Sequence, residues 1–147
     1  MRRFGKPREY GRKYVLRPGA YAILLRGRDM LITHQSEPFN EFQLPGGGID
    51  PGESAIVALH REVLEETGWK IAAPTRLGAY RRFGYMPEYD MWAEKICHIF
   101  VARPLRQVSA PLELDHQAIW TDAKSAARIL CNKGDRHFVR HHLLSGL

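Results

Sequence analysis

A helix bounded on both sides by glycine-containing turns constrains the fold of this chain more than any other feature of its sequence. Ser54 follows a turn at Pro51-Gly52 and is a typical helix N-cap, and Gly68 is typical of a residue that ends a helix. The residues between them are rich in Ala, Leu and Glu, which favour helix. The sequence therefore predicts one helix between Ser54 and Gly68, shortly after a loop of glycines at 46–48.

One face of this expected helix carries three glutamates, Glu62, Glu65 and Glu66, at spacings i, i+3 and i+4. Like charges at these spacings repel by about 0.2–0.5 kcal/mol per pair. The last two also face an unfavourable helix dipole, at about 0.3–1 kcal/mol each. Arg61 is the one obvious offset, so the cluster is unfavourable unless a cation binds. Carboxylate oxygens suit Mg²⁺, or Mn²⁺, better than zinc.

Residues 47–69 read GGIDPGESAIVALHREVLEETGW. This segment resembles the signature of the MutT-like Nudix hydrolases, G-x5-E-x7-R-E-U-x-E-E-x-G-U, in which U is a bulky apolar residue. Its positions are filled by Gly47, Glu53, Arg61, Glu62, Val63, Glu65, Glu66, Gly68 and Trp69. A solvated acidic helix face is the simplest alternative, but it does not explain the glycine loop or the spacing of Glu53 and Arg61.

The resemblance implies an α/β fold, the Nudix-type α/β/α sandwich with a mixed β-sheet. It also implies Mg²⁺-dependent hydrolysis of a phosphoanhydride in a nucleoside diphosphate linked to another group, NDP-X. Such substrates include nucleoside triphosphates, dinucleoside polyphosphates and nucleotide sugars. A catalytically silent, nucleotide-sensing domain is an alternative, but such relatives usually lose signature residues and this chain has lost none.

By position, the resemblance implies that Glu62, Glu65 and Glu66 hold the metal together with the backbone carbonyl of Gly46. One glutamate, most often that at position 62, helps to deprotonate the attacking water, and members of the family differ on which residue is the main base. Arg61 would orient the carboxylates, with Glu53 as its partner. Many relatives use a further acidic residue, and the candidates are Glu94, Glu113 and Asp115.

Substrate contacts are expected outside the signature. Tyr85 lies sixteen residues after Trp69, where diadenosine polyphosphate hydrolases of the family carry a tyrosine, and it could stack on a base. Pro87 lies two or three residues later than the proline typical of ADP-ribose hydrolases. Oxidised nucleoside triphosphates also stay open as substrates, because no residue excludes them.

The net charge of +6 is concentrated in a basic N-terminal arm, residues 1–17, ahead of a single domain at 18–147. The arm carries seven Lys and Arg residues against Glu9 alone. It could hold nucleic acid, guide polyphosphate substrates, or only act as a solubilising tail. An RNA 5′-end pyrophosphohydrolase is therefore an alternative function, although a nucleotide-type small molecule is the favoured partner.

Composition indicates a globular domain of 147 residues, 44% hydrophobic and 26% charged. No apolar run approaches a membrane span, and the basic N-terminus lacks the apolar stretch of a signal peptide. We therefore expect a cytoplasmic protein with no membrane contact and with Cys97 and Cys131 as reduced thiols. A homodimer is compatible with the sequence.

The remaining pattern predicts a mixed sheet between helical layers. Expected strands lie at 20–25, 30–34, 42–44, 71–80, 92–101 and 115–121, with a loop at 81–90. Asp122 is expected to cap a helix that runs to Cys131, Gly134 to stop it, and Asp135 to cap a last helix running to Leu144.

Overall fold

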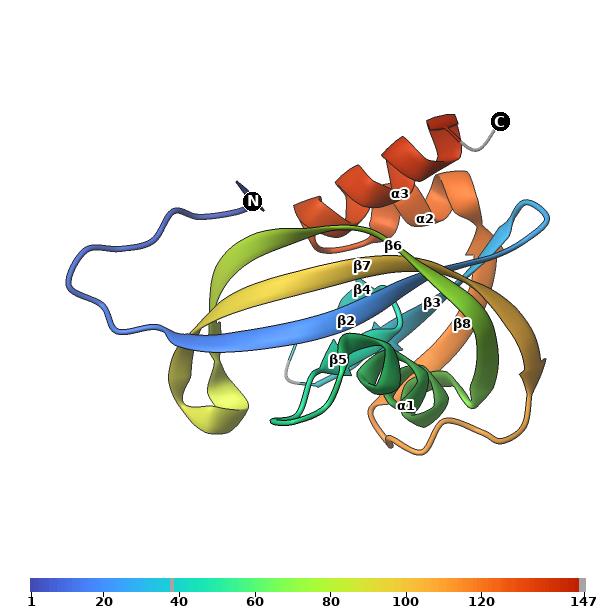
Figure 1. Ribbon diagram of the computed structural model, residues 1–147, viewed down its shortest axis with the longest axis horizontal. Coiled ribbons are helices and arrows are strands. Elements are labelled where there is room, and N and C mark those ends of the chain that lie inside the picture. The colour runs from blue at the N-terminus through green and yellow to red at the C-terminus, as the bar shows by residue number, and fades with distance from the viewer. Residues whose placement is uncertain (38, 146–147) are drawn as a thin grey trace.

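A mixed β-sheet lies between helices in the computed structural model, which describes residues 1–37 and 39–145 (Figure 1). In chain order the elements are β1 (Arg2–Arg3), β2 (Val15–Arg26), β3 (Asp29–Gln35), β4 (Glu41–Gln43), β5 (Gly46–Gly48), α1 (Ala55–Thr67), β6 (Trp69–Met86), the 3-10 turn η1 (Pro87–Tyr89), β7 (Met91–Gln107), β8 (His116–Asp122), α2 (Ala123–Ile129) and α3 (Lys133–Ser145). Helix α1 covers one side of the sheet, and α2 and α3 cover the other. The expected α/β/α sandwich is confirmed.

The strand order is β1-β6-β7-β2-β3-β4, with β5 paired to β2 and β8 paired to β3. β2 runs parallel to β7, β1 runs parallel to β6, and the other pairs are antiparallel, so the sheet is mixed as expected. The long antiparallel pair β6–β7 and the parallel pair β2–β7 join three neighbouring strands over most of their length. The register of these three strands decides which side chains lie together on each face.

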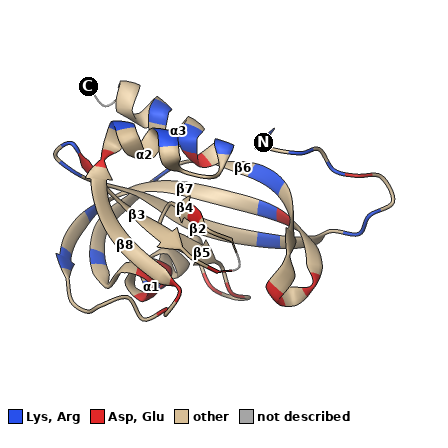
Figure 2. Ribbon diagram, turned by 180° about the vertical axis from the view of Figure 1, so that it is seen from behind, with Lys and Arg blue, Asp and Glu red and all other residues tan. Residues whose placement is uncertain are grey.

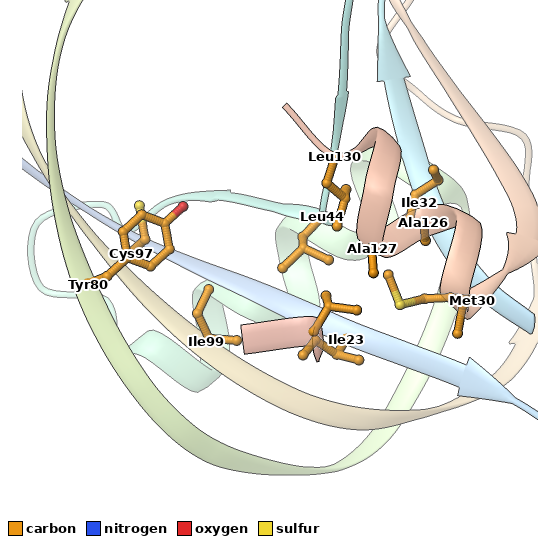
Figure 3. Packing of buried hydrophobic residues seen from close by; sticks show 12 residues of the cluster. Ile23, Met30, Ile32, Leu44, Tyr80, Cys97, Ile99, Ala126, Ala127 and Leu130 are labelled. Carbon is orange, nitrogen blue, oxygen red and sulfur yellow. The ribbon is translucent and has the colours of Figure 1, made fainter. Parts of the chain in front are cut away.

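The core has two parts because strand β2 is buried on both faces. Ile23 packs toward α2 and α3, in a cluster that includes Met30, Ile99 and Leu130 (Figure 3). Its neighbours in the strand, Ala22 and Leu24, face the other way and pack with residues of α1. Successive strand residues point to opposite faces, so an unbroken apolar run is what a strand between two helical layers requires. Each fully buried large apolar side chain contributes about 1.5–3 kcal/mol.

Both predicted ends of the signature helix are confirmed. The Ser54 hydroxyl accepts from the Val57 backbone N–H at 3.1 Å, and the Gly68 N–H donates to the Leu64 carbonyl at 2.8 Å. Gly68 has φ of 75°, and a Cβ there would lie 1.8 Å from the Ser109 carbonyl oxygen. The left-handed backbone and the lack of space both require glycine at position 68, which explains why a glycine marks this helix end in the sequence.

The expected loop at 81–90 is wrong. β6 continues to Met86, because its residues keep pairing with β7, with Tyr85 opposite Trp92 and Gly84 opposite Ala93. The Tyr14 ring also packs on Phe83, with ring centroids 4.9 Å apart. Cross-strand pairing and aromatic packing outweigh the glycine, which by itself only weakens a strand.

The expected helix stop at Gly134 is also wrong. Gly134 lies inside α3, which begins at Lys133, and Asp122 caps a helix α2 that ends at Ile129. A Cβ at position 134 would lie 2.4 Å from the Tyr80 ring. This glycine therefore serves close packing of α3 on the sheet.

The basic N-terminal residues contact the domain at several points. Arg2 and Arg3 pair with β6, and the Phe4 N–H donates to the Arg81 carbonyl at 2.9 Å. Further along, the Arg12 guanidinium carbon lies 3.6 Å from the centre of the Trp92 ring. The segment between them loops away from the sheet (Figure 1). Within residues 1–37 and 39–145, no helix has the length and apolar character that a membrane span needs.

Candidate active site

The glycine loop lies against the acidic face of α1. Strand β5 pairs with β2, which places Gly46 opposite Tyr21 and Gly47 opposite Ala20. A Cβ on Gly47 would lie 2.4 Å from Oε2 of Glu62. Only a residue without a side chain lets the Glu62 carboxylate come this close to the backbone, which explains the glycine at this position.

Arg61 donates hydrogen bonds both to the loop before α1 and to carboxylates on α1. Its Nε and Nη2 donate to the two oxygens of Glu53, both at 2.8 Å, and Nη2 also donates to the Gly48 carbonyl at 3.0 Å. Its Nη1 donates to Glu62 at 2.8 Å and to Glu65 at 3.4 Å. Arg61 therefore links the glycine loop to two of the helix carboxylates, and a bidentate contact of this kind gives a defined orientation.

The pKa values of the glutamates differ because their surroundings differ. Hydrogen bonds from Arg61 and from the Asp50 N–H lower the pKa of Glu53 to about 2. Burial raises the pKa of Glu62, although Arg61 opposes the rise. Burial also raises the pKa of Glu66 well above its usual range, and Glu113 and Glu62 add to this, while a backbone hydrogen bond from Gly46 opposes it.

Glu66 is 5% exposed, and its Oε2 is buried without a hydrogen-bond partner among the described residues. An ionised carboxylate in such a position is unfavourable unless something positive compensates it. Its oxygens are hard ligands in a group of other carboxylates, next to a loop of bare backbone. The residues present therefore fit a divalent cation such as Mg²⁺.

Glu113 comes from the loop before β8 and joins the carboxylates of α1. One oxygen each from Glu62, Glu65 and Glu113 lie within 4.8 Å of one another, and ligand atoms of Glu66, Glu113 and His116 do so as well. The loop is held on α1 by the Leu112 N–H, which donates to the Glu65 carbonyl at 2.8 Å.

Of the three further acids considered from the sequence, Glu113 is the one that the structure brings to the cluster. Glu94 instead pairs with Arg81, with 2.9 Å between carboxylate and guanidinium. Asp115 contributes its backbone carbonyl, which accepts from the Ser36 N–H at 3.1 Å.

His116 was missed as a site residue in the sequence. Its Nδ1 lies 2.8 Å from Glu113 and its Nε2 lies 3.9 Å from Glu66. Fifty residues separate it from Glu66, and no local spacing signals the contact. Only the pairing of β8 with β3 places it there.

A cleft of about 330 Å³ extends from these acids across the sheet. Glu66, Glu113, His116 and the glycines of β5 line one part of it, and the basic residues Arg17, Arg82 and Lys95 line another. Three tyrosines, Tyr21, Tyr80 and Tyr89, also contribute to its walls. The cleft thus combines a cation site with cationic and aromatic groups.

Tyr85 is not among the residues that line this cleft. Its hydroxyl donates to the Asp90 carboxylate, and its ring packs against Trp92, with centroids 5.3 Å apart. In β6 it alternates with Met86, which does line the cleft, so the structure places Tyr85 on the opposite face. Tyr89 of η1, four residues later, is among the residues that line the cleft.

Solved structures with the same fold include a NUDIX hydrolase from Nitrosomonas europaea, which is 18% identical with a TM-score of 0.70 and 90% of each chain covered. A MutT protein from Methanosarcina mazei Go1 is 20% identical with a TM-score of 0.70, with 91% of this chain and 97% of that chain covered. At these identities the likeness concerns the fold alone.

Three curated relatives carry different substrate names. A Bacillus subtilis (strain 168) protein provisionally named 8-oxo-dGTP diphosphatase is 36% identical over 50% of this chain, and an ADP-ribose pyrophosphatase of the same organism is 29% identical over 71%. An RNA pyrophosphohydrolase of Sulfurovum sp. (strain NBC37-1) is 39% identical over 38% of this chain. The matches span 50%, 56% and 39% of the lengths of these relatives, respectively.

The family model of the NUDIX domain matches residues 15–142. That range contains the glycine loop, the whole of α1 and the loop that carries Glu113. By this match over most of its length, the chain belongs to the Nudix family.

Proposed function

We propose that this chain is a Mg²⁺-dependent pyrophosphohydrolase that cleaves a phosphoanhydride in an NDP-X substrate. The observation that carries this proposal is the buried oxygen of Glu66, which has no hydrogen-bond partner in the described part of the chain and lies within a group of carboxylates beside the glycine loop. Membership of the Nudix family and the pyrophosphatase names of the relatives support it.

In this proposal Glu62, Glu65 and Glu66 hold the metal, the Gly46 carbonyl adds a backbone ligand, and Glu113 is the further acid. When bound, Mg²⁺ would neutralise charge on phosphate oxygens and make an attacking water more acidic. Mn²⁺ has similar ligand preferences and could replace it. The positive charge would also compensate the repulsion among the acids, which Arg61 offsets only in part.

The chain itself would position the groups and move a proton. Arg61 holds the carboxylates of Glu62 and Glu65 in place while Glu53 holds Arg61, so both are positioning residues. By its position in the signature we assign Glu62 to help deprotonate the water, with Arg61 fixing the orientation of its carboxylate. The cleft would hold the nucleotide, with Tyr89 available for stacking on the base.

The test is a turnover screen of nucleoside triphosphates, dinucleoside polyphosphates, ADP-ribose and nucleotide sugars with Mg²⁺ or Mn²⁺. Wild type is compared with Glu65→Gln and Glu66→Gln, and Glu94→Gln serves as a matched control because its carboxylate pairs with Arg81 outside the cluster. We expect large losses in the first two variants and not in the control. Equal turnover in all four proteins would contradict the metal assignment.

A second candidate function, action on RNA 5′ ends, has its own structural support. A groove of about 510 Å³ between β1 and α3 is lined by Arg2, Lys133, Arg136 and Arg140. Figure 2 shows the basic residues along α3 and near the N-terminus. A cationic groove of this kind could follow a phosphate backbone.

This candidate predicts steep salt dependence, with the logarithm of the binding constant falling by about 0.7 per neutralised phosphate for each unit of log salt. Lys133→Gln and Arg140→Gln should each reduce that slope for a 5′-triphosphorylated RNA. As a control, neither variant should change the turnover of the free nucleoside triphosphate. Equal slopes in wild type and variants would contradict a role of the groove.

A further inference from the structure

Three basic side chains form one row across the sheet inside the candidate active-site cleft. Arg82 of β6 lies directly opposite Lys95 of β7, and Lys95 lies directly opposite Arg17 of β2. All three line the same cleft as Glu66 and Glu113. Figure 2 shows basic residues side by side across these three neighbouring strands.

This row is electrostatically unfavourable without a partner, because like charges directly opposite each other destabilise a strand pair. Among residues 1–37 and 39–145, none of the three makes a salt bridge or a side-chain hydrogen bond, and the Nε of Arg82 is buried without a partner. The guanidinium carbon of Arg17 lies 4.9 Å from the centre of the Tyr89 ring, a cation–π contact that leaves its positive charge unneutralised. Burial and the charge of Arg82 both lower the pKa of Lys95.

The acids that share the cleft form no salt bridge with the row among the residues that the structure describes. Asp135 accepts a hydrogen bond of 2.6 Å from the Tyr80 hydroxyl, and Glu88 lines the cleft at η1. On the opposite face of the same two strands, Arg81 is paired with Glu94 at 2.9 Å. The basic residue on the face away from the cleft, Arg81, is therefore neutralised by an acid. The row of Arg17, Lys95 and Arg82, which lines the cleft, is not.

The row is separated along β2 from the glycine loop that lies against the Glu62 carboxylate. Arg17 is two residues from Gly19, which pairs with Gly48, and four residues from Tyr21, which pairs with Gly46. At about 3.3 Å per residue the offset is roughly 7–13 Å. An anion held by the row would therefore be a different group from the phosphate held at the carboxylates.

We propose that Arg17, Lys95 and Arg82 bind a second phosphate of the substrate, carried by the group X and distinct from the anhydride that is cleaved. The inference rests on the proposed function for the carboxylate site, and it narrows the substrate class to NDP-X compounds in which X bears a phosphate.

The first experiment measures binding without catalysis. Metal-free protein in EDTA is titrated calorimetrically with inorganic tripolyphosphate at constant ionic strength. We expect wild type to bind, and Lys95→Gln and Arg82→Gln each to weaken binding about tenfold or more, as loss of a partly buried charge contact does. Arg103→Gln, an exposed arginine on β7, is the matched control and should bind like wild type.

Two further variants identify the site. Glu65→Gln should bind tripolyphosphate at least as well as wild type, because the row does not use the metal ligands. Lys95→Gln removes a repulsive charge, so its melting temperature should equal or exceed that of wild type and its loss of binding is not unfolding. Unchanged binding in both row variants, or loss in Arg140→Gln instead, would overturn the proposal and place the anion beside α3.

The second experiment compares substrates that differ by one phosphate. ADP-ribose 1″-phosphate is compared with ADP-ribose, because these two compounds differ only by a phosphate on the group X. Lys95→Gln should raise KM for the phosphate-bearing member about tenfold more than for its partner. An equal increase in KM for both compounds would overturn the inference. If wild type turns over no nucleotide, the proposed function fails. The tripolyphosphate titration still tests whether Arg17, Lys95 and Arg82 bind a phosphate.

Discussion

Arg61 and Glu53 form a bidentate pair, with Nε and Nη2 of the arginine each 2.8 Å from one oxygen of the glutamate. Eight residues separate them, and Glu53 lies before the helix while Arg61 lies in it. The remaining guanidinium nitrogen, Nη1, reaches Glu62 at 2.8 Å. The loop before α1 thereby controls the orientation of a carboxylate on α1.

Replacement of Arg61 by lysine tests whether activity depends on its positive charge or on its bidentate contact with Glu53. Arg61→Lys keeps the positive charge but cannot reproduce the planar, bidentate contact. We expect Mg²⁺-dependent activity to fall about 10- to 100-fold, as it does when residues that orient metal ligands are changed. The measurement is a Mg²⁺ titration of turnover, with circular dichroism to show that α1 is retained. Arg103→Lys should behave like wild type, and an equally active Arg61→Lys would contradict the positioning role.

The same pair predicts a pH dependence of stability. Folding lowers the pKa of Glu53 from 4.5 to about 2, so the native state favours the ionised form. The stabilisation is therefore fully present above about pH 4.5 and is lost as the pH falls toward 2. Urea unfolding of wild type and Glu53→Gln should differ most near neutral pH, and the difference should shrink over this window. A difference that is constant from pH 6 to pH 2 would exclude this cause.

Two neighbouring glycines provide a matched pair of substitutions. Gly47→Ala places a Cβ 2.4 Å from the Glu62 carboxylate and must displace it, whereas a Cβ on Gly48 meets nothing within 4 Å in the described part of the chain. We expect Gly47→Ala to remain folded, because the end of a glutamate side chain can move, but to lose activity about 10- to 100-fold. Gly48→Ala should retain most of its activity. The measurement is kcat for the two variants. Equal values would contradict the prediction that a Cβ at position 47 displaces the Glu62 carboxylate.

Tyr89 and Tyr85 have similar exposures, 55% and 41%, but different surroundings. Tyr89 lines the cleft, while Tyr85 packs on Trp92 and bonds to Asp90. Loss of a stacking partner costs about 1–3 kcal/mol per base, so Tyr89→Ala should raise KM for the preferred nucleotide by roughly tenfold. Tyr85→Ala should leave KM nearly unchanged. The reverse result would restore Tyr85 as the substrate contact.

Binding of Mg²⁺ should increase the thermal stability of the folded protein. A ligand at 100 times its Kd stabilises the folded state by about 2.7 kcal/mol. We expect Mg²⁺ to raise the melting temperature of wild type, and to raise that of Glu66→Gln much less. In EDTA, the same variant should be more stable than wild type by about 1–3 kcal/mol, because an uncompensated buried carboxylate is removed. Equal responses to Mg²⁺ would argue against Glu66 as a ligand.

The sequence by itself determined the local part of the site. Ser54 and Gly68 define the ends of α1, and helix periodicity then places Glu62, Glu65 and Glu66 on one face. These features depend on hydrogen bonds and side-chain spacings within a few residues, which a sequence displays directly. The family resemblance and the sandwich fold followed from the same segment.

Only the tertiary structure decided the rest. Glu113 and His116 reach the helix because β8 pairs with β3, and Tyr85 faces away from the cleft because β6 pairs with β7 beyond the expected strand end. The row of Arg17, Lys95 and Arg82 exists only through the register of three strands. Register depends on packing between distant segments, and a shift by one residue would turn each of these side chains to the opposite face.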